Sequence, residues 1–149
     1  MVRPIALAAL SMLMSVGAAA SAEAKVFRGK TVQGRPASVV IGSDGLLRTA
    51  RVNWRARCRT GGRVREKTAF SRPHDQSSPD AFLDEGTYRG RTPDGYRLRF
   101  TGSIREQRIA DERGERWRGS FRMKVLVTRR GRYVDTCRSG RLRFTLRPA

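Results

Sequence analysis

The residues with the most recognisable chemistry are arginines, which recur at every second position along four apolar stretches of the chain. A guanidinium group presents a planar fork of N–H donors that matches the oxygen atoms of phosphate and carboxylate groups. If neighbouring strands carry these stretches, the basic side chains share a face and attract polyanions. We therefore expect a polyanion-binding surface made of Arg51, Arg55, Arg57, Arg97, Arg99, Arg118, Arg122, Lys124, Arg141 and Arg143.

The same basic residues also have a simpler interpretation. Only four of the 32 basic residues are lysines, and such a bias is typical of GC-rich coding that fills exposed positions with arginine. The formal net charge of +19 promotes non-specific association as well as specific binding. A specific polyanion site and a merely solvated basic surface are both open on this pattern.

The chain offers little for catalysis or metal binding. Its one histidine, His74, precedes Asp75, but adjacent side chains rarely form an oriented pair, and no G-x-S-x-G motif occurs. Adjacent carboxylates such as Asp84 and Glu85 would point to opposite faces of a strand. One histidine and two cysteines are too few for a zinc or iron–sulfur site. We expect no enzymatic activity, no cofactor and no metal.

The first residues predict a cleaved signal peptide. Residues 1–4 include Arg3, residues 5–16 are mostly apolar, and residues 17–24 are mostly small, which is the order of regions in a secretory signal. Cleavage is expected after Ala22 or Ala24. The apolar run is shorter than the roughly 20 residues that span a bilayer. We expect residues 1–24 to be removed and residues 25–149 to form one exported domain, periplasmic or extracellular.

Export decides how the two cysteines are interpreted. Cys58 and Cys137 lie 79 positions apart, and an even pair in an oxidising compartment favours a disulfide. Closing a loop of this length stabilises the folded state by roughly 4 kcal/mol in the chain-entropy model.

The alternation that spaces the arginines also predicts the strands, because period two is typical of a strand with one buried face. The strongest pattern covers residues 50–58, 96–104, 117–127 and 141–147. Weaker strands are predicted at residues 26–30, 37–41, 64–70, 82–89 and 132–137. Short segments rich in glycine and proline separate these strands and predict turns. Among them, Arg130-Gly131 and Ser139-Gly140 predict tight hairpins.

Two longer connections complete this plan. Residues 71–80 predict a surface loop, and residues 109–115 predict either a loop or the tip of a hairpin. Eight or nine strands without an amphipathic helix predict an antiparallel all-β domain, for which a sandwich and a small barrel are both suitable. The aromatic residues fall in phase with the apolar face, so we expect them in the core rather than stacking on nucleic-acid bases.

Three short segments carry a resemblance. Residues 27–36 read FRGKTVQGRP, residues 54–58 read WRARC, and Cys137-x-x-Gly140-x-Leu142 lies near the end of the chain. Together they resemble small, uncharacterised exported bacterial proteins that have an all-β domain and a single disulfide. The resemblance implies export, the bridge and the strands, and it implies no activity, substrate or catalytic residue.

The sequence therefore predicts an exported, non-enzymatic β domain that binds an anionic component of the cell envelope. The expected partners are anionic lipid, lipopolysaccharide or an anionic wall polymer, and we do not expect nucleic acid. The alternative is a barrel that carries a small apolar ligand, because Ala50, Ala56, Gly102 and Gly119 on the apolar faces could leave room inside.

Overall fold

The computed structural model describes residues 23–71 and 75–149, and every helix or strand assigned in them is a β-strand. The strands are β1 (Lys25–Thr31), β2 (Pro36–Ile41), β3 (Leu47–Cys58), β4 (Arg63–Ser71), β5 (Asp75–Ser78), β6 (Ala81–Arg91), β7 (Tyr96–Asp111), β8 (Gly114–Arg129), β9 (Arg132–Arg138) and β10 (Leu142–Pro148). The nine predicted strands are all present. The expected leader, apart from residues 23 and 24, lies outside the described residues. The described residues include no helix of the length and apolarity that crossing a membrane requires.

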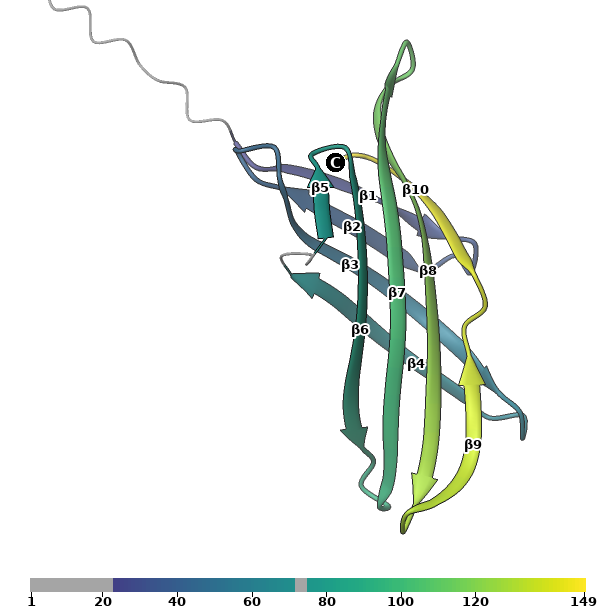
Figure 1. Cartoon of the computed structure of the whole chain (residues 1–149). Coiled ribbons are helices and arrows are strands. Elements are labelled where there is room, and N and C mark those ends of the chain that lie inside the picture. The colour runs from purple at the N-terminus through teal and green to yellow at the C-terminus, as the bar shows by residue number, and fades with distance from the viewer. Residues whose placement is uncertain (1–22, 72–74) are drawn as a thin grey trace, which may run out of the picture.

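The strands pair in antiparallel fashion throughout, in one continuous sheet that folds over into two layers (Figure 1). The first layer has the order β4-β3-β2-β1, and the second has the order β5-β6-β7-β8. β10 joins the layers because it pairs with β1 on one side and with β8 on the other. β9 joins them again, since it pairs with β8 and with the end of β3. The all-β prediction is confirmed, and the folded sheet corresponds only loosely to a sandwich or a barrel.

The core lies between the two layers, as the alternation predicts. Trp54, Trp117 and Phe121 are fully buried, and the rings of Trp54 and Phe121 lie 6.2 Å apart between centroids. Phe27 on β1 contacts Trp117 on β8 edge-on, at 6.5 Å, so the aromatic contacts cross from one layer to the other. Burying side chains of this size contributes about 1.5–3 kcal/mol each, which makes the core the main force holding the layers together.

Neighbouring side chains cover the small residues on the inner faces. A Cβ atom added at Gly102 would lie 2.6 Å from Met123 Cε, and one added at Gly119 would lie 2.4 Å from the Phe144 ring. These glycines therefore let a long side chain from the next strand lie flat across the sheet. The alternative hypothesis, a barrel that carries a small apolar ligand, stays a prediction.

One polar side chain fills a gap in the strand pairing. β2 ends its pairing with β3 at Ala37 and Val52, and beyond this point the Gln33 side chain takes the place of a strand. Its amide donates to the Arg55 carbonyl (2.8 Å) and accepts from the Arg55 N–H (2.9 Å). The Gln33 amide also lies 3.5 Å from the Ser139 carbonyl, so it links β3 to the segment between β9 and β10.

The predicted disulfide closes the same junction. Cys58 on β3 and Cys137 on β9 lie directly opposite each other and are bonded. Next to this bond, the buried Asp135 carboxylate accepts hydrogen bonds from the Thr60 hydroxyl and from the backbone N–H groups of residues 59, 60 and 136. These hydrogen bonds, led by the one from Thr60, lower the pKa of Asp135. A disulfide is typical of a non-cytoplasmic environment.

Ser139-Gly140 does not form the hairpin that we predicted. β9 and β10 both run antiparallel to β8 and follow one after the other along it. Three residues, 139–141, lie opposite the two residues 122 and 123 of β8, so the connection is an irregular bend between two strands that pair with β8 in succession. Ser139 keeps the pairing intact because its N–H donates to the Met123 carbonyl and its Oγ accepts from the Met123 N–H.

Two other connections are resolved by the structure. Residues 75–78, inside the predicted loop 71–80, form the short strand β5, which pairs with β6. Residues 109–115 form the tip of the long β7–β8 hairpin, with pairing up to Asp111 and Gly114. Figure 1 shows this hairpin projecting beyond the other strands. Local sequence missed β5 because its four residues carry no apolar alternation.

Candidate anion-binding groove

The structure distributes the ten predicted basic residues over both layers. All ten lie on the outward side of their segments, and none is buried. Arg51 and Arg55 lie on the outer face of the first layer, and Arg57 lies at the end of β3, where that strand meets β9. The other seven share the outer side of β7, β8, β10 and the residue just before β10: Arg97, Arg99, Arg118, Arg122, Lys124, Arg141 and Arg143. The sequence-based surface is therefore divided, and most of it lies on the second layer.

Three cations lie side by side across three neighbouring strands. Arg138 on β9 is directly opposite Arg57 on β3 and directly opposite Lys124 on β8. We call these three residues the cation row. Like charges directly opposite each other destabilise a sheet. None of the three forms an ion pair with any residue that the structure describes.

The cation row continues into hydroxyl groups on the same outer face. Thr101 on β7 lies opposite Lys124, and Thr87 on β6 lies opposite Thr101, with their Oγ1 atoms 3.5 Å apart. In the neighbouring row, Ser103 lies between Arg122 on β8 and Glu85 on β6. The side chains near the centre of the sheet are therefore small and polar, and the cations lie toward β8 and β9.

These small side chains form the floor of a groove with a volume of about 590 Å³. We call it the basic groove, and define it by the cations Arg122, Lys124, Arg138 and Arg141 together with Glu85, Thr87, Thr101 and Ser103. All four cations are exposed. Four cations and one carboxylate leave a formal charge of +3, and the volume is typical of small-molecule sites.

Further basic residues extend the positive face in both directions from the basic groove. A neighbouring hollow of about 470 Å³ is lined by Arg105, Arg118 and Arg143 among others. On the other side, two pairs of arginines lie directly opposite each other across β6 and β7: Arg89 with Arg99, and Arg91 with Arg97. The outer face of the second layer is thus a long basic surface with the groove within it.

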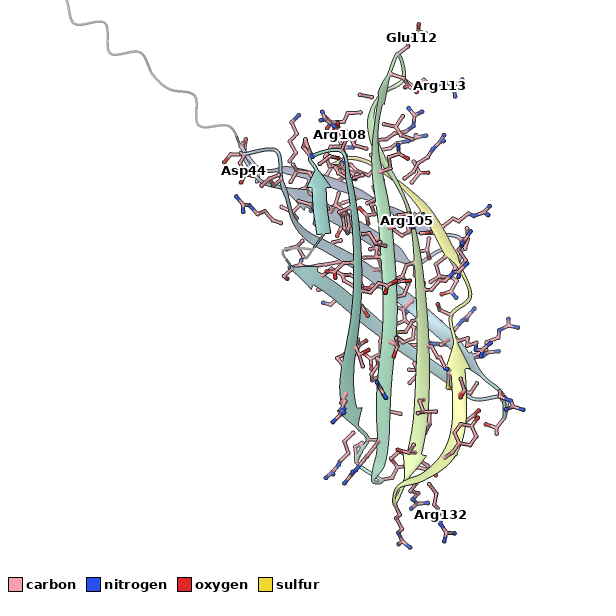
Figure 2. The ribbon with its side chains drawn as sticks, viewed as in Figure 1. Asp44, Arg105, Arg108, Glu112, Arg113 and Arg132 are labelled. Carbon is pink, nitrogen blue, oxygen red and sulfur yellow. A yellow bond between two sulfur atoms is a disulfide. The ribbon has the colours of Figure 1, made fainter. Side chains whose placement is uncertain are left out.

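The ion-paired carboxylates of the described residues lie away from the groove. The ion pairs among the described residues are Lys25–Glu115, Asp44–Arg48, Asp80–Arg108, Arg108–Glu115 and Asp111–Arg116. Figure 2 shows Asp44 and Arg108 toward the end of the molecule that carries the Glu112–Arg113 tip, and Arg132 at the opposite end. These pairs neutralise charge toward the end of the molecule that carries the tip, and they leave the cations of the groove without an ion pair to any described residue.

No family model, curated protein or solved structure matches this chain. The resemblance to small exported bacterial proteins therefore stays a prediction, and the argument for function depends on the groove itself.

Sequence reasoning missed Arg138 and the polar floor. Arg138 was outside the alternating stretches, but the disulfide could have revealed it. If Cys58 and Cys137 are directly opposite in an antiparallel pair, residues 57 and 138 are opposite too. Thr87, Thr101 and Ser103 carried no comparable signal, because a hydroxyl residue on an outward position is common in any strand.

Among the residues that the structure describes, those considered for catalysis are not brought together. His74 lies outside the described residues. Glu85 faces the groove opposite Ser103, and Asp84 takes the other face opposite Ile104. The described residues contain one group with metal-ligand spacing, Cys58, Asp135 and Cys137, but both of its sulfur atoms are held in the disulfide.

Proposed function

We propose that this protein is an exported, non-enzymatic β domain that binds an anionic component of the cell envelope through the basic groove. The observation that carries the proposal is the cation row, two of whose members, Lys124 and Arg138, line the groove. Arg57, Arg138 and Lys124 repel one another across adjacent strands, and no carboxylate among the described residues relieves that repulsion. A bound anion would stabilise this arrangement, since charge-assisted hydrogen bonds are among the strong ones.

The compartment narrows the choice of anion. The proposed signal peptide and the disulfide together favour an oxidising compartment outside the cytoplasm. The nearest polyanions there are anionic lipids, lipopolysaccharide and anionic wall polymers. Bulk charge alone would attract all of these equally from any side of the protein, so the proposal makes a claim about location.

Charge reversal on the two layers tests that claim. The triple variant Arg122→Glu, Lys124→Glu and Arg138→Glu alters the groove. The matched control, Arg28→Glu, Arg51→Glu and Arg65→Glu, places the same change in net charge on exposed positions of the first layer. Retention is measured on immobilised heparin and on immobilised lipopolysaccharide over a series of salt concentrations.

We expect the groove variant to lose retention at a much lower salt concentration than the control. The slope of log retention against log salt should also be smaller, because fewer counterions are released on binding. Equal losses in the two variants would contradict the proposal and would leave only non-specific attraction by net charge.

A further inference from the structure

The basic groove has two chemically different sides. The β8–β9 side carries Arg122, Lys124 and Arg138, which attract an oxyanion. The β6–β7 side carries hydroxyl groups and the carboxylate of Glu85, which repels an oxyanion but accepts hydrogen bonds from hydroxyl or ammonium groups. A ligand that fills the groove must therefore be anionic at one end and a hydrogen-bond donor at the other.

The width of the groove follows from the register. Glu85, Ser103 and Arg122 lie directly opposite one another on three consecutive strands, so the outer two backbones are about 10 Å apart. Glu85 and Arg122 form no ion pair across this gap, and Ser103 between them is short and only half-buried. The space above Ser103 is therefore lined by a donor on one wall and an acceptor on the other.

We propose that the basic groove binds one phosphorylated sugar unit, with its phosphoryl group on the cations and its hydroxyl or amino groups on Glu85 and the threonine and serine floor. This inference rests on the proposed function, and it replaces a diffuse polyanion by a discrete headgroup. A phosphoryl group fits the cations better than a single carboxylate does, because it offers more oxygen atoms and more charge to several donors. Because the Glu85 carboxylate accepts hydrogen bonds from an ammonium group, the preferred ligand is an amino sugar.

Calorimetry on the full-length protein tests the inference with three soluble probes at one low ionic strength. The probes are glucosamine 6-phosphate, glucose 6-phosphate and inorganic phosphate. We expect glucosamine 6-phosphate to bind most tightly, and inorganic phosphate to bind about tenfold more weakly than glucose 6-phosphate, since one or two hydrogen bonds account for roughly that factor. Equal affinity for glucose 6-phosphate and inorganic phosphate would overturn the inference.

Three variants separate the contribution of the groove floor from that of the cations. Ser103→Leu fills the space between Glu85 and Arg122 without altering the charge, and Ser120→Leu makes the same change on β8 outside the groove. We expect Ser103→Leu to bind glucose 6-phosphate about tenfold more weakly and Ser120→Leu to bind it normally. Glu85→Gln should abolish the preference for the amino sugar. Equal loss in the two leucine variants, or an unchanged preference in Glu85→Gln, would overturn the inference.

The sugar phosphate could be free or part of a lipid headgroup, and competition distinguishes these sources. Displacement of the protein from immobilised lipopolysaccharide by glucosamine 6-phosphate would assign the site to the lipid-linked sugar. Tight binding of the soluble probe without displacement would assign it to a free sugar phosphate. A different result would contradict the proposed function: the groove variant and the first-layer control would show the same retention at every salt concentration. If those variants differ and the three probes do not, the face binds polyanions and the groove selects no sugar.

Discussion

At the scale of single residues, the most unusual group is the carboxyl of Glu106. Glu106 lies on the inner side of β7, opposite Phe82 on β6 and Gly119 on β8, and only 1% of the residue is exposed. Neither of its oxygen atoms has a hydrogen-bond partner among the described residues. Burial in these apolar surroundings raises the pKa of Glu106 well above its usual value of 4.5, so the folded state favours the neutral form.

This burial predicts a specific dependence of stability on pH. Below about pH 4.5 Glu106 is protonated in both states and has no effect on the free energy of unfolding. As the pH rises above that value, the unfolded chain loses the proton while the folded chain keeps it, so this group lowers stability by about 1.4 kcal/mol per pH unit until its folded pKa is reached. Glu106→Gln removes this contribution.

Urea denaturation at pH 3.5 and at pH 7 measures the effect. We expect Glu106→Gln to be more stable than the wild type at pH 7, and the difference to shrink at pH 3.5. A gain of the same size at both pH values would show that ionisation of Glu106 is not its cause.

At the scale of elements, β9 ends at an electrostatically unfavourable position in the sheet. Its last residue, Arg138, has a cation directly opposite on each side, Arg57 on β3 and Lys124 on β8. If Arg138 serves anion binding, replacing it with an acidic residue should raise the free energy of unfolding and weaken anion binding.

Arg138→Glu tests this opposition. Replacing the central cation with a carboxylate turns two repulsive pairs into two attractive pairs, so we expect the free energy of unfolding to rise by about 0.2–1 kcal/mol per pair. Retention on heparin should fall in the same variant. Arg143→Glu on β10, which lies opposite Ser120 rather than a cation, serves as the control for stability. A stability loss in Arg138→Glu would contradict the assignment of strain to the cation row.

The bend between β9 and β10 shows what local sequence could not decide. Gly140 has a φ of 71°, which suits a hairpin turn and an irregular bend equally well. The difference lies in the partner strand, because β8 is long enough to pair with β9 and β10 in succession. Arg130-Gly131, by contrast, forms the predicted turn, since β8 and β9 are hydrogen-bonded up to Arg129 and Arg132.

At the scale of the whole molecule, the disulfide supports the junction where both layers meet. Cys58 belongs to the first layer and Cys137 to β9, and the bond closes a loop of 79 positions. We expect Cys58→Ala with Cys137→Ala to lower the free energy of unfolding by about 2–5 kcal/mol. Wild-type protein under dithiothreitol should show a similar loss in urea denaturation. Equal stability of oxidised and reduced protein would contradict a bracing role.

The strands and their inward faces could be predicted from the sequence because they depend on period-two alternation, which is a local property. Trp54, Phe121 and Leu146 are buried where the alternation predicts, and Arg51, Arg99 and Arg122 are outward. The disulfide was predictable as well, since the chain has only two cysteines.

The division of the basic residues was decided only by tertiary structure. Alternation determines whether an arginine points inward or outward, but strand order and register determine which arginines become neighbours. Arg57 and Arg138 are 81 positions apart in sequence and directly opposite in the sheet, while Arg51 and Arg57 share a strand and only Arg57 lies at the junction of the layers. The cation row arises from that long-range pairing, which no period in the local sequence records.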